Sequence, residues 1–234
     1  MENQSTDKSY YDNQKVDNIS IFAKKIGSYY ERYKKFIEEA FSNNGPITVL
    51  EMGAGSCTLS LLVSNLSFVE KVICYDISFE RMRNIVEKNA QNIECVYSKL
   101  EYVEGDFSNT IPFDSDSIDL ILFDASLHHT RSMWNTIDEC HRVLKKGGMV
   151  IAQRETTLGK FTSSLKMEKL LHTEEVRMGV SENAYLKEQY EYYFKANGFS
   201  TRFIPMAETT LQKLLLPLNG LVFSKWIILA SVKK

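Results

Sequence analysis

The alternation of strand-like and helix-like segments over residues 47–155 constrains the fold of this 234-residue chain more than any other feature. Short apolar runs predict strands, and between them lie stretches whose apolar side chains recur at helical spacing. The expected strands are 47–53, 71–78, 100–107, 117–127 and 149–155, and the expected helices are 57–66, 79–91 and 133–146. Gly147 and Gly148 are expected to end the last of these helices. This pattern is typical of a parallel sheet with helices on both faces.

The first 42 residues are expected to form a polar segment and a lid-like helix ahead of a single domain at 43–234. Residues 1–18 are polar and are expected to be mobile. Residues 19–42 place aromatic and aliphatic side chains at helical spacing, which predicts a helix that ends at the stretch Asn-Asn-Gly-Pro. The tyrosines of this helix either cover a site as a lid or only pack against the sheet.

The last third of the chain departs from the alternation. Residues 156–180 permit no assignment, and a helix is expected at 181–199. Two further strands, near 199–206 and 222–232, have no helix-sized segment between them. The sequence therefore predicts an antiparallel pair at the edge of the sheet.

Charge and cysteine usage exclude several classes of protein. The formal net charge is −2 and the pI is about 6.1, so the chain lacks the basic field that nucleic acid requires. The four cysteines form no C-x-x-C pair, which argues against a zinc cluster or a disulfide framework. No apolar run of about 18 residues and no signal-peptide pattern is present. We expect a cytoplasmic protein without a membrane partner.

A glycine-containing turn follows the first strand of the alternation. Glu51 ends that strand, and Gly53 and Gly55 let a ligand approach the backbone closely. Asp76 ends the second strand, where a carboxylate can accept both hydroxyls of a ribose. A dinucleotide is disfavoured, because Thr58 replaces the last glycine of G-x-G-x-x-G and because Glu51 would repel a pyrophosphate. An adenosine that carries an amino acid fits better.

Five motifs in order resemble those of class I methyltransferases that use S-adenosylmethionine. They are Glu51-Met52-Gly53-Ala54-Gly55, Asp76, Asp106-Phe107, "SIDLILFDASLHH" at 117–129 and "HRVLKKGGMVIA" at 141–152. Lys146 stands where the family usually has proline, and Cys57 where it often has a third glycine. The resemblance implies a Rossmann-like, seven-stranded, mostly parallel α/β sheet with helices on both faces and an antiparallel last strand.

The resemblance also implies a cofactor and its site. The cofactor is S-adenosyl-L-methionine, and its product is S-adenosyl-L-homocysteine. The residues expected to bind it are Glu51, Gly53, Gly55, Asp76, Ile77, Asp106, Phe107 and Asp124. Asp76 can also cap the helix that follows it, a role compatible with binding ribose.

Two adjacent histidines, His128 and His129, follow the fourth strand and are the candidates for catalysis. One of them is expected to act, because a neutral imidazole takes a proton near working pH and adjacent side chains point opposite ways. The alternative is that both are structural. No metal is expected, because the sequence has no third ligand at a spacing from Asp124 and the histidines that is typical of a metal site.

Substrate contacts are expected from Tyr30, Arg154 and Asn183, and a variable region on the substrate side is expected at about 156–220. The alternative for Glu182 and Asn183 is that they only cap the late helix. The predicted function is methyl transfer to a hydroxyl or amine of a small molecule, such as a natural product, a sugar or another metabolite. The alternatives are a non-catalytic cofactor-binding scaffold and a nicotinamide-dependent oxidoreductase. The oligomeric state is not predicted.

Overall fold

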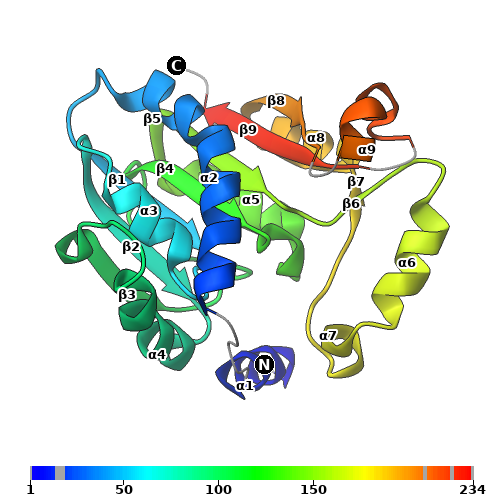
Figure 1. The fold of residues 1–234 in the computed structure, drawn as a ribbon, viewed down its shortest axis with the longest axis horizontal. Coiled ribbons are helices and arrows are strands. Elements are labelled where there is room, and N and C mark those ends of the chain that lie inside the picture. The colour runs from blue at the N-terminus through cyan, green and yellow to red at the C-terminus, as the bar shows by residue number, and fades with distance from the viewer. Residues whose placement is uncertain (1, 14–18, 208–209, 222–223, 233–234) are drawn as a thin grey trace.

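The computed structural model describes residues 2–13, 19–207, 210–221 and 224–232, so residues 1 and 14–18 of the expected N-terminal segment lie outside the described part. The described residues form a seven-stranded sheet in the order β3-β2-β1-β4-β5-β9-β8 and a small two-stranded sheet, β6-β7 (Figure 1). The strands of the large sheet are β1 (Ile47–Met52), β2 (Val69–Asp76), β3 (Leu100–Glu104), β4 (Ile118–Asp124), β5 (Leu144–Gln153), β8 (Phe199–Pro205) and β9 (Trp226–Val232). The small sheet pairs β6 (Thr157–Leu158) with β7 (Tyr185–Leu186).

The sheet confirms the expected mixture of parallel and antiparallel strands. β1 to β5 pair in parallel, and β9, the last strand, is antiparallel to both β5 and β8. The expected antiparallel pair at the edge of the sheet is confirmed, with β8 at the edge and β9 between β8 and β5. The burial of the two strands explains this order: residues 227–230 are buried in succession, as a covered strand requires, whereas β8 is mostly exposed or half-buried.

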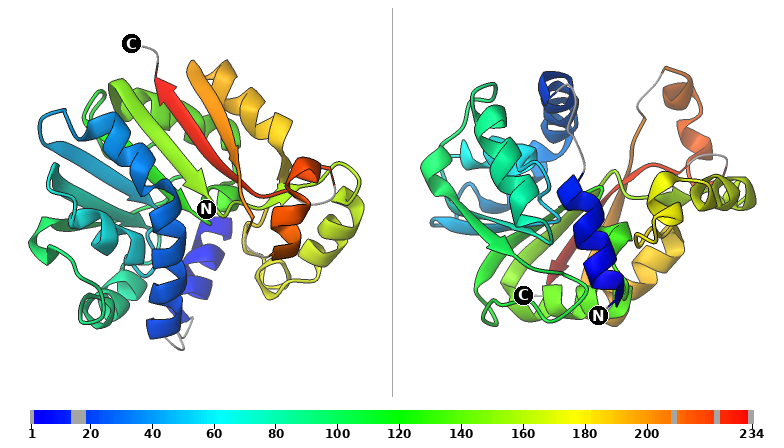
Figure 2. Two further views of the ribbon diagram at one scale, coloured as in Figure 1. Left: turned by 45° about the horizontal axis from the view of Figure 1, so that its top comes forward. Right: turned by 90° about the horizontal axis from the view of Figure 1, so that it is seen from below.

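Helices cover both faces of the large sheet (Figures 1 and 2). α2 (Ile19–Phe41) and α3 (Thr58–Ser64) pack over one face and share a core with β1, and α4 (Phe79–Ala90) packs beside them. α5 (Met133–Val143) and α8 (Lys187–Ala196) cover the other face. α5 buries Met133, Ile137 and Cys140, which its helical spacing places on one side.

The predicted end of α5 is wrong by three residues. The helix ends at Val143, and the chain enters β5 at once, with Leu144 paired to Ile118 before a register shift. Gly148 therefore does not stop a helix. A Cβ at this position would lie 2.8 Å from the carbonyl oxygen of Lys145, so glycine is required where the irregular start of β5 folds back closely on itself.

The region after β5 contains short elements that the sequence did not resolve. α6 (Ser163–Leu171) and α7 (Glu174–Arg177) occupy the unassigned stretch, and α8 begins at Lys187, six residues later than expected. α9 (Thr210–Leu214) and the 3₁₀ turn η3 (Leu216–Leu218) lie between β8 and β9, where no helix was expected. Within the described ranges, no helix has the length and apolar character needed to cross a bilayer.

The N-terminal residues 2–13 form a helix, α1 (Glu2–Asn13), which was not expected for so polar a stretch, and the mobility expected of residues 1–18 stays a prediction. Figure 2 shows this helix lying across the carboxyl ends of the strands. Polar contacts hold it: Asp7 bonds to Arg131, Lys8 pairs with Glu104, and Asp12 accepts a hydrogen bond from Ser78. These polar contacts join α1 to residues at or after the ends of β2, β3 and β4.

Candidate functional site

A cavity of about 280 Å³ lies at the carboxyl ends of β1, β2 and β4. β1 has β2 on one side and β4 on the other. Strands β2 and β3 extend the sheet in one direction from β1, and β4 and β5 extend it in the opposite direction. Open α/β sheets bind their ligands at such a reversal. All eight residues expected to bind the cofactor line this one cavity.

The turn after β1 follows the backbone path that its glycines predict. Gly53 and Gly55 have φ angles of +72° and +51°, in the region that favours glycine. A Cβ on Gly53 would lie 2.5 Å from the Cβ of Ser126, whose hydroxyl donates to the carbonyl of Met52 at 2.6 Å. Cys57 also adopts a left-handed conformation, with φ +54°, which explains why glycine is often preferred there. The turn is therefore set by its left-handed backbone, and at Gly53 it also has no room for a side chain.

Glu51 is the most deeply buried acid in the cavity. Its side chain accepts hydrogen bonds from the backbone and the hydroxyl of Ser60, the former at 2.8 Å, and the residue is only 3% exposed. Burial raises the pKa of Glu51 to about 8. A positively charged ligand group beside it would restore ionisation, so this end of the cavity suits an ammonium group.

Asp76 closes the turn from the end of β2. One carboxylate oxygen accepts from the backbone of Gly55 and the other from the backbone of Ser78, both at 2.8 Å. Each carboxylate oxygen has a second acceptor site. Asp76 can therefore hold the glycine turn and still accept two ligand hydroxyls, as a ribose would offer.

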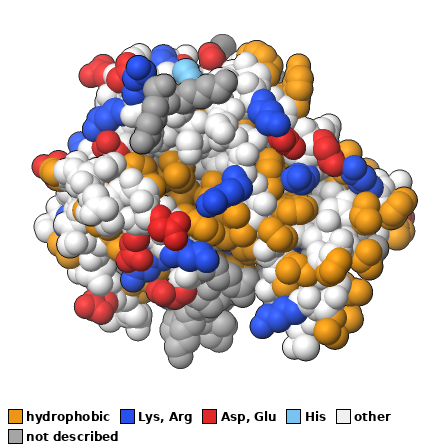
Figure 3. All heavy atoms as spheres, turned by 90° about the horizontal axis from the view of Figure 1, so that it is seen from above, with side chains coloured by type: hydrophobic (Ala, Val, Ile, Leu, Met, Phe, Trp, Pro, Cys, Tyr) orange, Lys and Arg blue, Asp and Glu red, His pale blue; other side chains and the backbone are white. Residues whose placement is uncertain are grey.

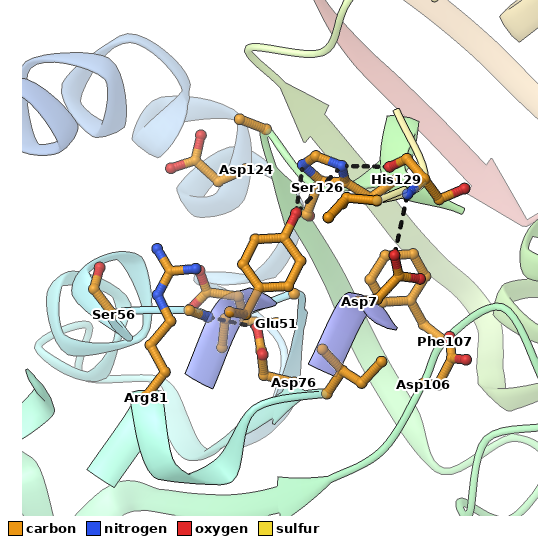
Figure 4. A pocket seen from close by; sticks show the side chains of 18 of the residues that line it. Asp7, Glu51, Ser56, Asp76, Arg81, Asp106, Phe107, Asp124, Ser126 and His129 are labelled. Carbon is orange, nitrogen blue, oxygen red and sulfur yellow. Dashed lines mark hydrogen bonds between the residues drawn. The ribbon is translucent and has the colours of Figure 1, made fainter. Parts of the chain in front are cut away.

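Asp106 and Phe107 lie on the neighbouring wall, below Asp7 in Figure 4. Asp106 already accepts bonds from the backbone of Ser108 at 2.9 Å and from the guanidinium of Arg131. Phe107 stands edge-on to Phe123, with ring centroids 5.8 Å apart, and presents a flat apolar surface to the cavity. Phe107 is the better placed of the two to contact an aromatic base.

Asp124 and Arg154 form an ion pair where β4 and β5 end. The Nε atom of Arg154 lies 2.6 Å from Asp124, and Gln153 donates to the same oxygen at 3.0 Å. Arg154 has a φ of +55°, and its guanidinium lies 5.3 Å from the ring centroid of Tyr29. Both members of the pair line the cavity.

The two histidines occupy different environments. His128 is buried, and its Nδ1 lies 2.6 Å from Glu155, a carboxylate that also accepts the backbone N–H groups of residues 126–128. His129 lines the cavity, and its Nδ1 lies 2.8 Å from the carbonyl of Ser181 and 3.0 Å from Glu182. Burial lowers the pKa of His129, but the hydrogen bond and charge of Glu182, together with the carbonyl of Ser181 and the charge of Glu155, outweigh burial and hold the pKa above its ordinary value.

The same histidines and Glu182 are the group that could hold a metal ion in the described part of the chain. One donor atom from each lies within 4.8 Å of the others. Glu155 on the far nitrogen of His128 would be a suitable outer partner. His129, however, directs Nδ1 at a backbone carbonyl, which marks that nitrogen as a hydrogen-bond donor rather than a ligand. Hydrogen bonds thus account for the cluster, and the expectation of no metal stays a prediction.

α1 closes the open side of the cavity with two side chains that sequence reasoning missed. Asp7 bonds to Arg131 at 2.8 Å and accepts from the backbone of Ser181 at 3.1 Å. The hydroxyl of Tyr11 lies 3.4 Å from Nε2 of His129, and its ring stacks under the guanidinium of Arg81 at 5.3 Å. Figure 4 shows Asp7 and His129 on the side of the pocket opposite Arg81.

Three of the expected site residues do not line the cavity. His128 faces Glu155, and Tyr30 is buried in the core between α2 and the sheet. Asn183 donates to the carbonyls of His128 and Thr130 at 3.0 and 2.9 Å, which pins its segment to the turn that bears the histidines. The capping alternative for Asn183 and its neighbour Glu182 is also wrong, because α8 begins only at residue 187.

Comparison with known proteins gives a family match over the centre of the chain. Residues 50–152 match the family described as "Methyltransferase domain". The curated relatives are demethylmenaquinone methyltransferases from two strains of Leptospira interrogans, 31% identical over 115 residues. The aligned region is 49% of this chain and 45% of each relative, so the match spans about half the length of those proteins.

Solved structures share the fold at low identity. Geranyl diphosphate C-methyltransferase from Streptomyces coelicolor, solved with Mg²⁺, geranyl diphosphate and S-adenosyl-L-homocysteine, has a TM-score of 0.64 at 13% identity and covers 100% of this chain and 99% of its own. The YcgJ protein of Bacillus subtilis has a TM-score of 0.62 at 18% identity, covering 88% and 99%. A [4+2]-cyclase has a TM-score of 0.59 at 15% identity, covering 86% and 80%. These likenesses establish the fold alone.

Proposed function

We propose that this chain, whose residues 50–152 match the methyltransferase domain family, transfers the methyl group of S-adenosylmethionine to a small molecule. The observation that carries the proposal is the single cavity that unites Glu51, the glycine turn and Asp76. Its charges and its steric demands match an adenosine bearing an amino acid and are a poor match for a pyrophosphate.

The residues of the cavity fit this cofactor in three places. Glu51 would face the ammonium group, Asp76 the ribose hydroxyls and Phe107 the adenine ring. The cofactor supplies an electrophilic methyl group when it is bound. The chain must then hold an acceptor in line with that methyl group and exclude water, since displacement depends mainly on positioning.

We assign proton removal to His129 rather than His128. His129 faces the cavity, and Glu182 on Nδ1 orients the ring and raises its basicity, which leaves Nε2 for the acceptor. Nε2 lies 3.4 Å from the hydroxyl of Tyr11, so an acceptor hydroxyl or amine would take the place of that contact. His128 instead bonds to Glu155, and this contact holds the turn that carries His129 in place.

α1 acts as a lid in this proposal, in place of the tyrosines of α2. Asp7 and Tyr11 reach the cavity from α1, and the ion pair of Asp7 with Arg131 fastens the helix over it. Burial raises the pKa of Tyr11, so it stays a neutral hydroxyl in the wall of the cavity. A lid that opens and closes would admit the acceptor and then exclude water.

The test is transfer of labelled methyl groups from S-adenosylmethionine to a small-molecule extract. The wild type should yield a labelled product, and His129→Ala should lower turnover by roughly a hundredfold or more while cofactor affinity stays near normal. The matched control is His141→Ala, which changes a histidine that packs against Phe199 at 5.4 Å, outside the cavity, and it should keep its turnover. Equal turnover in the two variants would contradict the role given to His129.

Two alternatives stand beside this proposal. The fold is also that of a [4+2]-cyclase, so a chain with this architecture could bind the cofactor without transferring its methyl group. Tight binding of S-adenosylhomocysteine with no label transfer would favour such a non-catalytic role. A labelled product with a new carbon–methyl bond would confirm methyl transfer but overturn the choice of a hydroxyl or amine.

A further inference from the structure

Exposed apolar side chains are concentrated on one side of the molecule. Of the twelve large hydrophobic side chains exposed among the described residues, eight lie on or beside α6 and α9. We call these eight the apolar patch: Phe161, Leu165, Met167, Leu171, Met178, Leu211, Leu214 and Leu218. Phe161 is 79% exposed and Leu214 is 75% exposed, so both project into solvent. A cluster of this kind is unusual on a protein surface without a binding role.

Backbone contacts join the two halves of the apolar patch into one surface. The N–H groups of Lys160 and Phe161 donate to the carbonyls of Gly220 and Leu221 at 2.9 and 3.0 Å. Figures 1 and 2 show α6 and α9 on the same side of the molecule as a result. The space-filling view shows hydrophobic side chains gathered on that side, with lysine or arginine side chains between them (Figure 3).

The charge around the apolar patch has the opposite sign to that of the whole chain. Residues 160–178 and 210–218 carry five lysines or arginines and three glutamates, whereas the chain has a net charge of −2. Lys160 pairs with Glu188 at 2.8 Å, but Lys169 and Lys213 are exposed on the two helices. Leucine, methionine and phenylalanine flanked by lysine suit an anionic lipid surface, which accepts the apolar groups and attracts the cations.

The apolar patch also lies beside the cavity. α7 follows α6 directly, and Glu175 of α7 lines the cavity while Met178, three residues later, belongs to the apolar patch. A lipid surface at the patch would therefore lie near the edge of the cavity formed by α7. An acceptor dissolved in that surface would have a short path to the site.

We propose that the apolar patch docks the protein on an anionic lipid bilayer, with its apolar side chains among the acyl chains and its lysines at the head groups. This peripheral contact needs no spanning helix, and it revises the expectation of no membrane partner. The docking itself does not depend on methyl transfer, whereas delivery of a membrane-dissolved acceptor rests on the proposed function.

The test is co-sedimentation with vesicles of phosphatidylcholine, with and without phosphatidylglycerol. The wild type should bind the anionic vesicles, and Phe161→Glu combined with Leu214→Glu should weaken binding by on the order of tenfold or more. The matched control is Trp134→Glu combined with Tyr192→Glu, at side chains 45% and 63% exposed on α5 and α8. The control should bind as the wild type does.

Three results would overturn the proposal. The wild type could fail to bind anionic vesicles, or the patch and control variants could bind equally. The wild type could also be a dimer and the patch variant a monomer, in which case the apolar patch is an interface between two copies of the chain. Circular dichroism and S-adenosylhomocysteine affinity show whether each variant is folded. Both should match the wild type, because the changed side chains lie outside the cavity. Lys169→Glu with Lys213→Glu should weaken binding to anionic vesicles more than to neutral ones.

Discussion

Binding of S-adenosylhomocysteine should release a proton from Glu51. Burial places the pKa of this carboxyl at about 8 in the free protein. At pH 7 a group with that pKa is about nine-tenths protonated, and a bound ammonium group would favour the carboxylate. We therefore expect release of about 0.9 proton for each ligand bound at pH 7. Affinity should rise with pH by up to about tenfold per unit between pH 6 and 8.

The assay is calorimetry in two buffers that differ in ionisation enthalpy, because the difference in apparent binding enthalpy measures the protons released. Glu51→Gln should abolish the release. Glu101→Gln is the matched control, since Glu101 is an exposed acid paired with Lys71 at 3.0 Å on the outer strands, and it should keep the release. Tight binding by the wild type with less than about 0.2 proton released at pH 7 would show that Glu51 is already ionised. The argument from its burial would then be refuted.

Three further predictions concern the rest of the site. Glu182→Gln should lower the pKa of His129, so the rise of kcat/KM with pH should shift to lower pH; an unchanged profile would show that Glu182 does not act on the base. Asp7→Ala should loosen the α1 lid, raise the rate of proteolysis within residues 2–13 and lower turnover by on the order of tenfold; wild-type values for both would mean that α1 is not a lid. Treatment with EDTA should leave turnover unchanged, whereas loss of activity restored by Zn²⁺ would make the histidine cluster a metal site.

Free-protein stability gives an independent check on Glu51. Its folded pKa lies above the unfolded value of 4.5, so the folded chain keeps a proton that the unfolded chain releases. Stability should therefore fall as pH rises from about 4.5 to 8, and this fall should be smaller in Glu51→Gln. Melting curves of the two proteins across that range measure the difference.

The parts of the site that the sequence predicted are those set by local backbone chemistry. Gly53, Gly55 and the acids at the strand ends follow from a short stretch of chain, because a strand that ends in a glycine turn places its neighbours in one way. The parts that it missed come from distant segments. Glu182 stands 53 residues after His129, and Asp7 lies 124 residues before Arg131, so no spacing rule links these pairs.

The fold shows the same division. The parallel core was predicted because apolar runs and helical spacing are local signals. The position of β9 inside the sheet depends instead on how distant parts of the chain pack over it. The helix α1 was not predicted, because its polar residues carry no helical pattern of apolar side chains. Its contacts with Arg131 and Glu104 join residues far apart in the chain, so they form only once the fold is complete.

The most direct test of the central claim is a titration of the purified protein with S-adenosylhomocysteine and, separately, with NAD. The account predicts that S-adenosylhomocysteine binds and NAD does not, because Glu51 beside the Gly53–Gly55 turn suits an ammonium group and would repel a pyrophosphate. Asp76→Ala should weaken S-adenosylhomocysteine binding by on the order of ten- to a hundredfold, from the loss of bonds to a charged group. Binding of NAD, or unchanged affinity in a folded Asp76→Ala protein, would contradict the account.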